Sequence, residues 1–220
     1  MPSPLQFFDS STLTPHWADA PERPCFASGE IHLWRARLDD AWLLALSGDF
    51  LSASETVDGV RLASKRERKR HLALHALLRL VLARYTGARP NELRFTRDAM
   101  GRRELALSTL RFNLSQAGDL VLIAVAPSGE IGIEMEQVHE GLPFDEMAGE
   151  FFEIEDQWQL RITHDRAAKA AQFYDFWTTN EASAQTSESP RVHRFSPAEG
   201  FAAAVAVPHP NARFAFWDWR

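Results

Sequence analysis

Residues 111–136 (RFNLSQAGDLVLIAVAPSGEIGIEME) constrain the fold of this chain more than any other stretch. Leu120–Ala126 is a continuous apolar run, which is typical of a strand buried on both faces. The turn sequence PSGE separates this run from Ile131–Glu136, a second predicted strand. That strand ends in Glu134 and Glu136, and side chains two apart on a strand point to the same face. We therefore expect a sheet with two carboxylates on one face.

A pair of carboxylates on one face indicates a cation site. Like charges side by side are unfavourable unless something positive lies between them, and a hard divalent cation such as Mg²⁺ is the usual solution. The best candidate for a third ligand is Glu181, which closes the aromatic helical segment FYDFWTTNEA with Trp177 four residues earlier on the same helical face. The pattern predicts a metal site made by Glu134, Glu136 and Glu181.

Four segments in a fixed order carry a resemblance to a known family: FNLSxxGD, the strand ending GIEME, FFEIED and WTTNE. This order resembles the 4′-phosphopantetheinyl transferases of the surfactin-synthetase type, over most of the chain from about Ile31 to Trp217. In that family the strand usually ends G-[IV]-D-x-E, the helix carries W-x-x-K-E, and together they bind Mg²⁺ and the pyrophosphate of coenzyme A. The resemblance implies an α+β fold of two pseudo-symmetric subdomains with the active site in the cleft between them.

The resemblance also implies a function. The enzyme would move 4′-phosphopantetheine from coenzyme A to a serine of an acyl or peptidyl carrier protein, with Mg²⁺ as cofactor. Glu134, Glu136 and Glu181 would hold the metal, and Glu181 would also be the catalytic base. Residues at the family's coenzyme A positions are Arg70, Arg102, Ser115 and Gln116. Relatives of this length are commonly monomers.

Two of these coenzyme A positions have an equally simple structural interpretation. Arg70 belongs to a basic run, SKRERKR, that is typical of a solvated helix face as well as of a site for the 3′-phosphate. Arg102 follows a glycine turn where family members often carry G-K-P, and Arg can hold a phosphate through two parallel donors. A surface hairpin with incidental charge is the alternative for Arg102.

The chain departs from the family pattern at several charged positions. Glu134 replaces the usual first Asp, Asn180 stands at the lysine of W-x-x-K-E, Gln116 stands at a histidine, and Gln185 falls where a further lysine is usual. An amide cannot replace an ammonium beside developing negative charge. A second hypothesis is therefore a catalytically impaired homologue that binds coenzyme A or a carrier protein without transfer.

Charge is unevenly distributed along the chain. Between Arg61 and Arg111 there are 14 Lys and Arg against 4 Asp and Glu, whereas the whole chain has 24 against 30. A basic block beside an acidic remainder indicates an anionic ligand that meets metal-binding carboxylates. Nucleic acid is a weaker alternative, because aromatic residues are not interleaved with the charges and no nucleic-acid-binding motif is present. The single cysteine, Cys25, excludes an intramolecular disulfide.

The order of elements completes the prediction. Residues 1–28 are rich in Pro, Ser and Asp, and we expect a loosely ordered arm, followed by an N-terminal α+β subdomain over 29–129 and a C-terminal one over 130–220. The longest predicted helix runs from Ser64 to a stop at Gly87. Other expected elements are a strand at IHLWRARL, a short helix and turn in DDAWLLALSGDFLSASETVDGV, helical segments around 144–160 and 165–182, and strands near 192–195, 201–207 and 213–217. No apolar run approaches the roughly 20 residues that a membrane span needs, so we expect a cytoplasmic protein.

Overall fold

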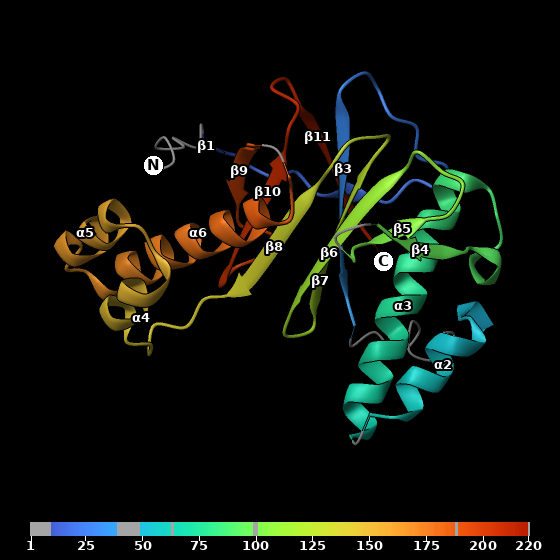
Figure 1. Ribbon diagram of the computed structural model, residues 1–220, viewed down its shortest axis with the longest axis horizontal. Helices are drawn as coiled ribbons and strands as arrows, with labels where there is room; N and C mark the ends of the chain where they lie inside the picture. The colour runs from blue at the N-terminus through green and yellow to red at the C-terminus, as the bar shows by residue number, and fades with distance from the viewer. Residues whose placement is uncertain (1–9, 39–48, 63, 99–100, 188, 220) are drawn as a thin grey trace. The chain divides into compact units, whose positions relative to one another are not determined.

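The computed structural model describes residues 10–38, 49–62, 64–98, 101–187 and 189–219. The fold is α+β with two mixed sheets, which agrees with the α+β class predicted from the sequence (Figure 1). Two compact units share the chain. Unit 1 lies within Met1–His16, Asn113–Gly118 and Gly129–Ala212, and unit 2 within Trp17–Phe112, Asp119–Ser128 and Arg213–Arg220. Each unit is thus assembled from separate stretches of the chain.

The sheet of unit 2 has the strand order β2-β11-β3-β7-β6. Its strands are β2 (Ala18–Asp19), β11 (Arg213–Asp218), β3 (Glu30–Arg37), β7 (Leu120–Ala126) and β6 (Arg111–Ala117). Strand β7 is buried at every position, which confirms the strand predicted from its apolar run. Strand β11 pairs parallel with β3, so the end of the chain completes a sheet that begins near its start. Strand β6 starts in unit 2, and its residues from Asn113 onward belong to unit 1.

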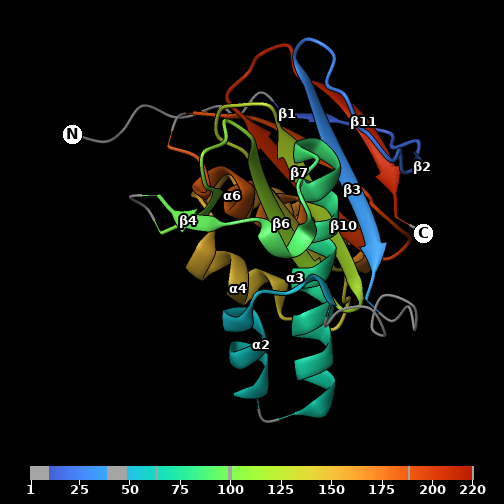
Figure 2. The same cartoon turned by 90° about the vertical axis from the view of Figure 1, so that its right-hand side faces the viewer.

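Helix α3 (Lys65–Thr86) is the predicted long helix of unit 2. The side chain of Ser64 caps its N-terminus by accepting hydrogen bonds from the amides of Arg66 and Glu67. Gly87 ends it in the left-handed conformation, with φ of 70°, that glycine adopts without steric cost. The shorter helix α2 (Ala53–Val60) packs beside α3 (Figure 2). Both predicted ends of the long helix are therefore confirmed.

A short turn and a hairpin follow α3. The 3₁₀ turn η1 (Pro90–Glu92) leads into β4 (Phe95–Arg97), which pairs antiparallel with β5 (Arg103–Leu105). Gly101, with φ of 81°, lies in the connection between these two strands. Arg102 thus lies in a β-hairpin, the local structure considered for it from the sequence.

Much of the basic block has a structural role inside unit 2. Arg79 is 2% exposed, and its Nε donates to Glu55 Oε2 at 2.7 Å. Arg103 donates to the other oxygen of Glu55 at 3.0 Å. The guanidinium of Arg84 lies 3.9 Å from the ring centroid of Trp219. These three arginines of the basic block thus form ion pairs and ring contacts within the fold.

The sheet of unit 1 has the order β1-β9-β10-β8. Its strands are β1 (Ser10–Thr12), β9 (Arg191–Phe195), β10 (Phe201–Val207) and β8 (Gly132–Gln137). Strand β8 is the predicted strand with the glutamate pair, shifted by one residue. Strand β10 lies between β9 and β8 and pairs antiparallel with both. The expected strands near 192–195, 201–207 and 213–217 are all present.

Helix α6 (Arg166–Ala184) covers the face of β8 and β10 (Figure 1). Small residues make this packing possible: in the strand register, Gly132 lies opposite Ala206, and the next positions of β10 on that face are Ala204 and Ala202. Ala182 of α6 packs against Ala204 and Ala206. Because Gly132, Glu134 and Glu136 alternate along β8, both glutamates lie on the face that α6 covers.

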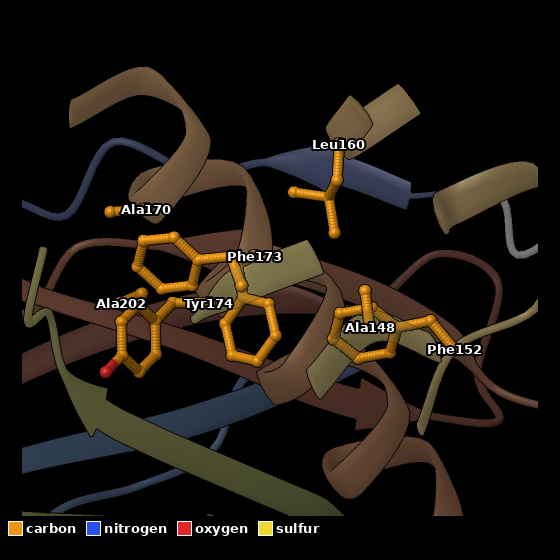
Figure 3. Close-up of a cluster of buried hydrophobic side chains, with 8 residues drawn as sticks. Ala148, Phe152, Leu160, Ala170, Phe173, Tyr174 and Ala202 are labelled. Carbon is orange, nitrogen blue, oxygen red and sulfur yellow. The ribbon is translucent and has the colours of Figure 1, made fainter. Parts of the chain in front are cut away.

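An aromatic cluster fixes the other end of α6. Phe173 is 1% exposed, and its ring centroid lies 5.0 Å from that of Phe152 and 5.5 Å from that of Tyr174 (Figure 3). Leu160 is fully buried in the same cluster. Trp177 packs parallel to Phe173 with a centroid distance of 6.1 Å. Burial of these rings anchors α6 to the two preceding helices.

Two expectations differ from the structure of unit 1. The helical segment expected around 144–160 is two helices, α4 (Phe144–Phe151) and α5 (Ile154–Ile162), because Phe152 is extended, with φ of −115° and ψ of 153°, and its ring joins the aromatic cluster. Residues of the expected loose arm form strands: β1 pairs parallel with β9, and in unit 2 β2 pairs with β11.

Part of the sequence prediction lies outside the described residues. This holds for residues 1–9 of the arm and for 39–48, the first part of the segment expected to hold a short helix and a turn. Among the described residues, no helix combines the length and the apolar character that crossing a membrane requires.

Candidate active site

The site begins with the two glutamates of β8 in unit 1. Glu134 and Glu136 are half-buried on the face that α6 covers, and their cross-strand neighbours are Ala204 and Ala202. Neither alanine carries a charge or a hydrogen-bonding side chain. The pair of carboxylates is therefore not neutralised from β10.

Of the three predicted metal ligands, Glu136 has a pKa that burial and its neighbours shift. Burial raises the pKa of the Glu136 carboxyl above its usual value, the negative charge of Glu134 raises it further, and His139 partly opposes the shift. The charge of Glu181, exposed on α6, also raises this pKa. Negative charge thus accumulates around Glu136, which is the condition that a bound cation would relieve.

Both oxygens of the Glu134 carboxylate accept hydrogen bonds from this chain. Oε1 accepts from Ser115 Oγ at 2.6 Å and from the amide of Met135 at 3.1 Å. Oε2 accepts from Gln185 Nε2 at 3.2 Å. Gln185 caps the C-terminus of α6, so the carboxylate is held by β6, β8 and the helix end together.

Ser115 and Gln116, both predicted to bind coenzyme A, differ in their surroundings. Ser115 is buried, and its hydroxyl lies between Glu134 and the amide of Met135, which donates to Oγ at 3.1 Å. Gln116 is exposed, and its side-chain amide donates to the carbonyl of Gly118 at 3.2 Å. Of the two side chains, that of Gln116 is the one exposed to solvent.

The predicted phosphate-binding arginines lie in unit 2, where each forms an ion pair. Arg70 Nη2 lies 2.7 Å from Asp119 Oδ1, and both side chains are partly exposed. Arg102 Nε donates to Asp98 Oδ2 at 2.6 Å inside the β4–β5 hairpin, and its backbone amide donates to Oδ1 of the same residue. A phosphate would therefore share these guanidinium groups with a carboxylate.

The sequence patterns do not mark Asn113 or Gln185 as site residues. Gln185 stands in place of a lysine, and it follows Glu181 by four residues, which places the two close together at the helix end. The side-chain amide of Asn113 donates to Gln185 Oε1 at 2.7 Å. No local signal points to this contact, because 72 residues separate the two side chains along the chain.

The donor set is compatible with Mg²⁺. Among the residues that the structure describes, no group of three or more His, Cys, Asp and Glu side chains is gathered to hold a metal ion. Mg²⁺, however, is usually bound through one or two carboxylates together with substrate phosphates and several waters. Glu134 and Glu136, adjacent on one face of β8 and unneutralised by β10, supply such a pair.

Comparison with known proteins gives a consistent result. The chain is 32% identical over 172 residues to the 4′-phosphopantetheinyl transferase HetI of Nostoc sp. (strain PCC 7120 / SAG 25.82 / UTEX 2576), covering 76% of this chain and 72% of that protein. It is 30% identical over 136 residues to the putative 4′-phosphopantetheinyl transferase slr0495 of Synechocystis sp. (strain ATCC 27184 / PCC 6803 / Kazusa), covering 60% of this chain and 54% of that protein. No family model matches the chain.

Proposed function

The chain belongs to the 4′-phosphopantetheinyl transferase family, and we propose that it catalyses Mg²⁺-dependent transfer of 4′-phosphopantetheine from coenzyme A to a serine of an acyl or peptidyl carrier protein. In this reaction the serine oxygen bonds to the phosphorus that carries the pantetheine group. The pyrophosphate P–O bond breaks, adenosine 3′,5′-bisphosphate leaves, and the serine proton passes to a base.

One observation supports this function above the others. Glu134 and Glu136 lie on one face of β8 with only alanines opposite them on β10, and the charges of Glu134 and Glu181 raise the pKa of Glu136. Such a concentration of negative charge suits a divalent cation that also binds a pyrophosphate.

The residues of unit 1 would have distinct roles in metal and pyrophosphate binding. Glu134 and Glu136 would hold Mg²⁺, with Glu181 as the third ligand. A bound Mg²⁺ supplies positive charge that neutralises the pyrophosphate of coenzyme A during transfer. Gln116 would donate a hydrogen bond to the pyrophosphate. Ser115, whose hydroxyl hydrogen goes to Glu134, would serve the site through that carboxylate.

Proton transfer and coenzyme A placement involve the other predicted residues. Glu181 is exposed, so its carboxylate is accessible for the serine proton, and a general base of this kind contributes about 10²–10⁴-fold to the rate. In unit 2, Arg70 and Arg102 would bind the 3′-phosphate of coenzyme A, each next to the carboxylate that it already contacts. The pseudo-symmetric relation of the subdomains, a shared active site, a monomeric state and cytoplasmic residence stay predictions.

A homologue that binds coenzyme A or a carrier protein without transfer is the second candidate. The observation behind it is the loss of charge at three family positions, where Gln116, Asn180 and Gln185 stand. In the structure the amide of Gln185 donates to Glu134, so this residue is turned toward a metal ligand of the proposed site.

The deciding experiment is intact-mass spectrometry of an apo carrier protein incubated with this protein, coenzyme A and Mg²⁺. We expect a gain of one phosphopantetheine that disappears when a chelator is added. Glu136→Gln and Glu181→Gln should each reduce the rate about 100-fold or more. Glu150→Gln, an exposed position on α4, is the matched control and should retain activity.

The alternatives give different results. Unchanged modification by both the Glu136→Gln and Glu181→Gln variants would refute the proposed roles. Bound coenzyme A without any mass gain across several carrier proteins would favour the impaired homologue.

A further inference from the structure

We propose that Gln185 is a positioning residue that fixes the orientation of the Glu134 carboxylate for a divalent cation. The proposal rests on the proposed function, because it takes Glu134 as a metal ligand. It assigns a role to a residue that otherwise stands only as a departure from the family pattern. The chain of contacts runs from Asn113 through Gln185 to Glu134.

Hydrogen bonding to the backbone determines which way the Gln185 amide points. The backbone amide of Ile133 donates to Gln185 Oε1 at 2.9 Å. A backbone N–H can only donate, so the oxygen of the side-chain amide must face it. The nitrogen then faces Glu134 Oε2 at 3.2 Å, where a carboxylate can only accept.

Asn113 reinforces this orientation from β6. Its own amide is fixed by two backbone groups: Oδ1 accepts from the amide of Leu114 at 2.7 Å, and Nδ2 donates to the carbonyl of Ile131 at 3.1 Å. With its orientation set, Nδ2 also donates to Gln185 Oε1 at 2.7 Å. A reversed Gln185 amide would place donor against donor at both Ile133 and Asn113.

The opposite oxygen of Glu134 is fixed in the same way. The amide of Met135 donates to Ser115 Oγ at 3.1 Å, so the hydroxyl hydrogen is available for Glu134 Oε1 at 2.6 Å. Gln185 and Ser115 thus hold the two oxygens of one carboxylate. A carboxylate held at both oxygens needs less reordering when it binds a metal, and such outer partners are a general feature of metal sites.

A lysine at position 185 could not make the same set of contacts. An ammonium group donates but cannot accept, so the amide of Ile133 and Nδ2 of Asn113 would lose their acceptor. Gln185 combines an acceptor for β6 and β8 with a donor for Glu134. Gln185 therefore makes contacts that the lysine usual at this family position could not make.

The test is direct binding of Mn²⁺, as a spectroscopic substitute for Mg²⁺, to the full-length protein, measured by electron paramagnetic resonance without coenzyme A. Gln185→Leu keeps the approximate volume and removes the amide. We expect it to weaken Mn²⁺ binding about 10-fold or more, the effect typical of losing an outer partner of a metal ligand. Gln172→Leu is the matched control, because Gln172 is a hydrogen-bonded glutamine on the same helix that contacts Thr163 and Gln159. It should change Mn²⁺ affinity less than twofold.

A second variant keeps the proposal testable if the Gln185→Leu protein does not fold. Asn113→Ala changes no group that touches Glu134, and it should weaken Mn²⁺ binding in the same direction by a smaller factor. Thermal unfolding of each variant is followed alongside, since a folded Gln185→Leu or Asn113→Ala protein that binds Mn²⁺ like the wild type overturns the proposal. In the transfer assay, Gln185→Leu should raise the Mg²⁺ concentration for half-maximal rate and leave the KM for carrier protein unchanged.

The outcomes separate this proposal from the proposed function. A wild-type protein that binds Mn²⁺ in a Gln185-dependent way but transfers nothing supports the positioning role and refutes the transferase activity. A wild-type protein that transfers phosphopantetheine with equal Mg²⁺ dependence in Gln185→Leu supports the activity and overturns the positioning role. Absence of Mn²⁺ binding by the wild type overturns the positioning role, and the mass-spectrometric assay then decides the activity independently.

Discussion

Gly132 of strand β8 lies directly against the backbone carbonyl of Ala182 in helix α6. A β-carbon at position 132 would clash with that carbonyl oxygen, and no flexible side chain is available there to move aside. The same close approach brings Gln185, three residues after Ala182, within hydrogen-bonding distance of β8. The glycine of the GIEME segment therefore allows the helix end to reach the glutamate strand.

Gly132→Ala should destabilise unit 1 and disturb the site together. We expect a loss of about 1–3 kcal/mol in the free energy of unfolding, the usual result of overpacking, measured by urea denaturation. Mn²⁺ affinity should fall as well, because α6 and Gln185 must move away from β8. Gly149→Ala on α4 is the control: no atom lies within 4 Å of an added β-carbon there, so its stability should be unchanged or slightly higher. Equal stability of the two variants would contradict the packing argument.

Glu55→Gln should strongly destabilise unit 2. The carboxylate is 7% exposed and pairs with Arg79, which is 2% exposed, and with Arg103. Removing one partner of a buried ion pair leaves uncompensated charge and costs about 3–5 kcal/mol. The control is Asp58→Asn, which breaks an exposed pair with Arg61 and should change stability by less than about 1 kcal/mol. Similar unfolding midpoints for both variants would show that the Glu55 pair contributes little.

Acid should reduce the stability advantage of the wild type over Glu55→Gln. Burial alone would raise the pKa of the Glu55 carboxyl, but hydrogen bonds from His75, Arg79 and Ser52 outweigh it and hold the pKa far below its ordinary value of 4.5. The unfolded chain binds this proton before the folded protein does, so the stabilisation is complete above pH 4.5 and declines as the pH falls below it. Unfolding curves of both proteins between pH 7 and pH 3 measure this difference, and a constant difference would exclude the linkage.

Tyr85→Phe should destabilise unit 2 although the ring is retained. Trp34 Nε1 donates to the Tyr85 hydroxyl at 2.7 Å, and the hydroxyl lies 2.8 Å from His32 Nδ1. Burial lowers the pKa of His32, and its Nε2 lies 3.2 Å from the Glu30 carboxylate, which can only accept. Nδ1 of the neutral ring therefore accepts the hydroxyl hydrogen of Tyr85. Its removal leaves two buried groups without a partner, at about 1–3 kcal/mol for each. Thr86→Ala removes the hydroxyl of an exposed residue that donates to the carbonyl of Leu82 within α3, and it should cost less than Tyr85→Phe.

Introducing charged residues at positions 116 and 180 tests whether the side-chain amides there limit catalysis. If Gln116 and Asn180 limit the chemistry, Gln116→His combined with Asn180→Lys should raise kcat/KM at least 10-fold, as expected from adding about 1.5–3 kcal/mol of charge-assisted hydrogen bonding. Unchanged or lower kcat/KM would show that the wild-type residues already support transfer. The carrier-protein mass assay at limiting coenzyme A measures this directly.

Elements whose signals are local can be predicted from the amino-acid sequence. The apolar run Leu120–Ala126 became strand β7, and the cap at Ser64 with the stop at Gly87 bounded helix α3. The alternation in β8 was enough to place Glu134 and Glu136 on one face. Backbone geometry and side-chain periodicity extend over a few residues, so neighbours in sequence suffice to predict them.

Relations between distant residues could not be predicted in this way, because they depend on tertiary packing. Strand β11 pairs with β3, and helix α4 ends at Phe151 so that the ring of Phe152 joins the aromatic cluster. Hydrogen bonds connect Asn113 to Gln185 and Gln185 to Glu134. These outcomes depend on which surfaces pack together, and each amide can bond to many partners with similar energy. Local sequence therefore specifies the carboxylates of the site, whereas packing of α6 on β8 selects the side chains that hold them in place.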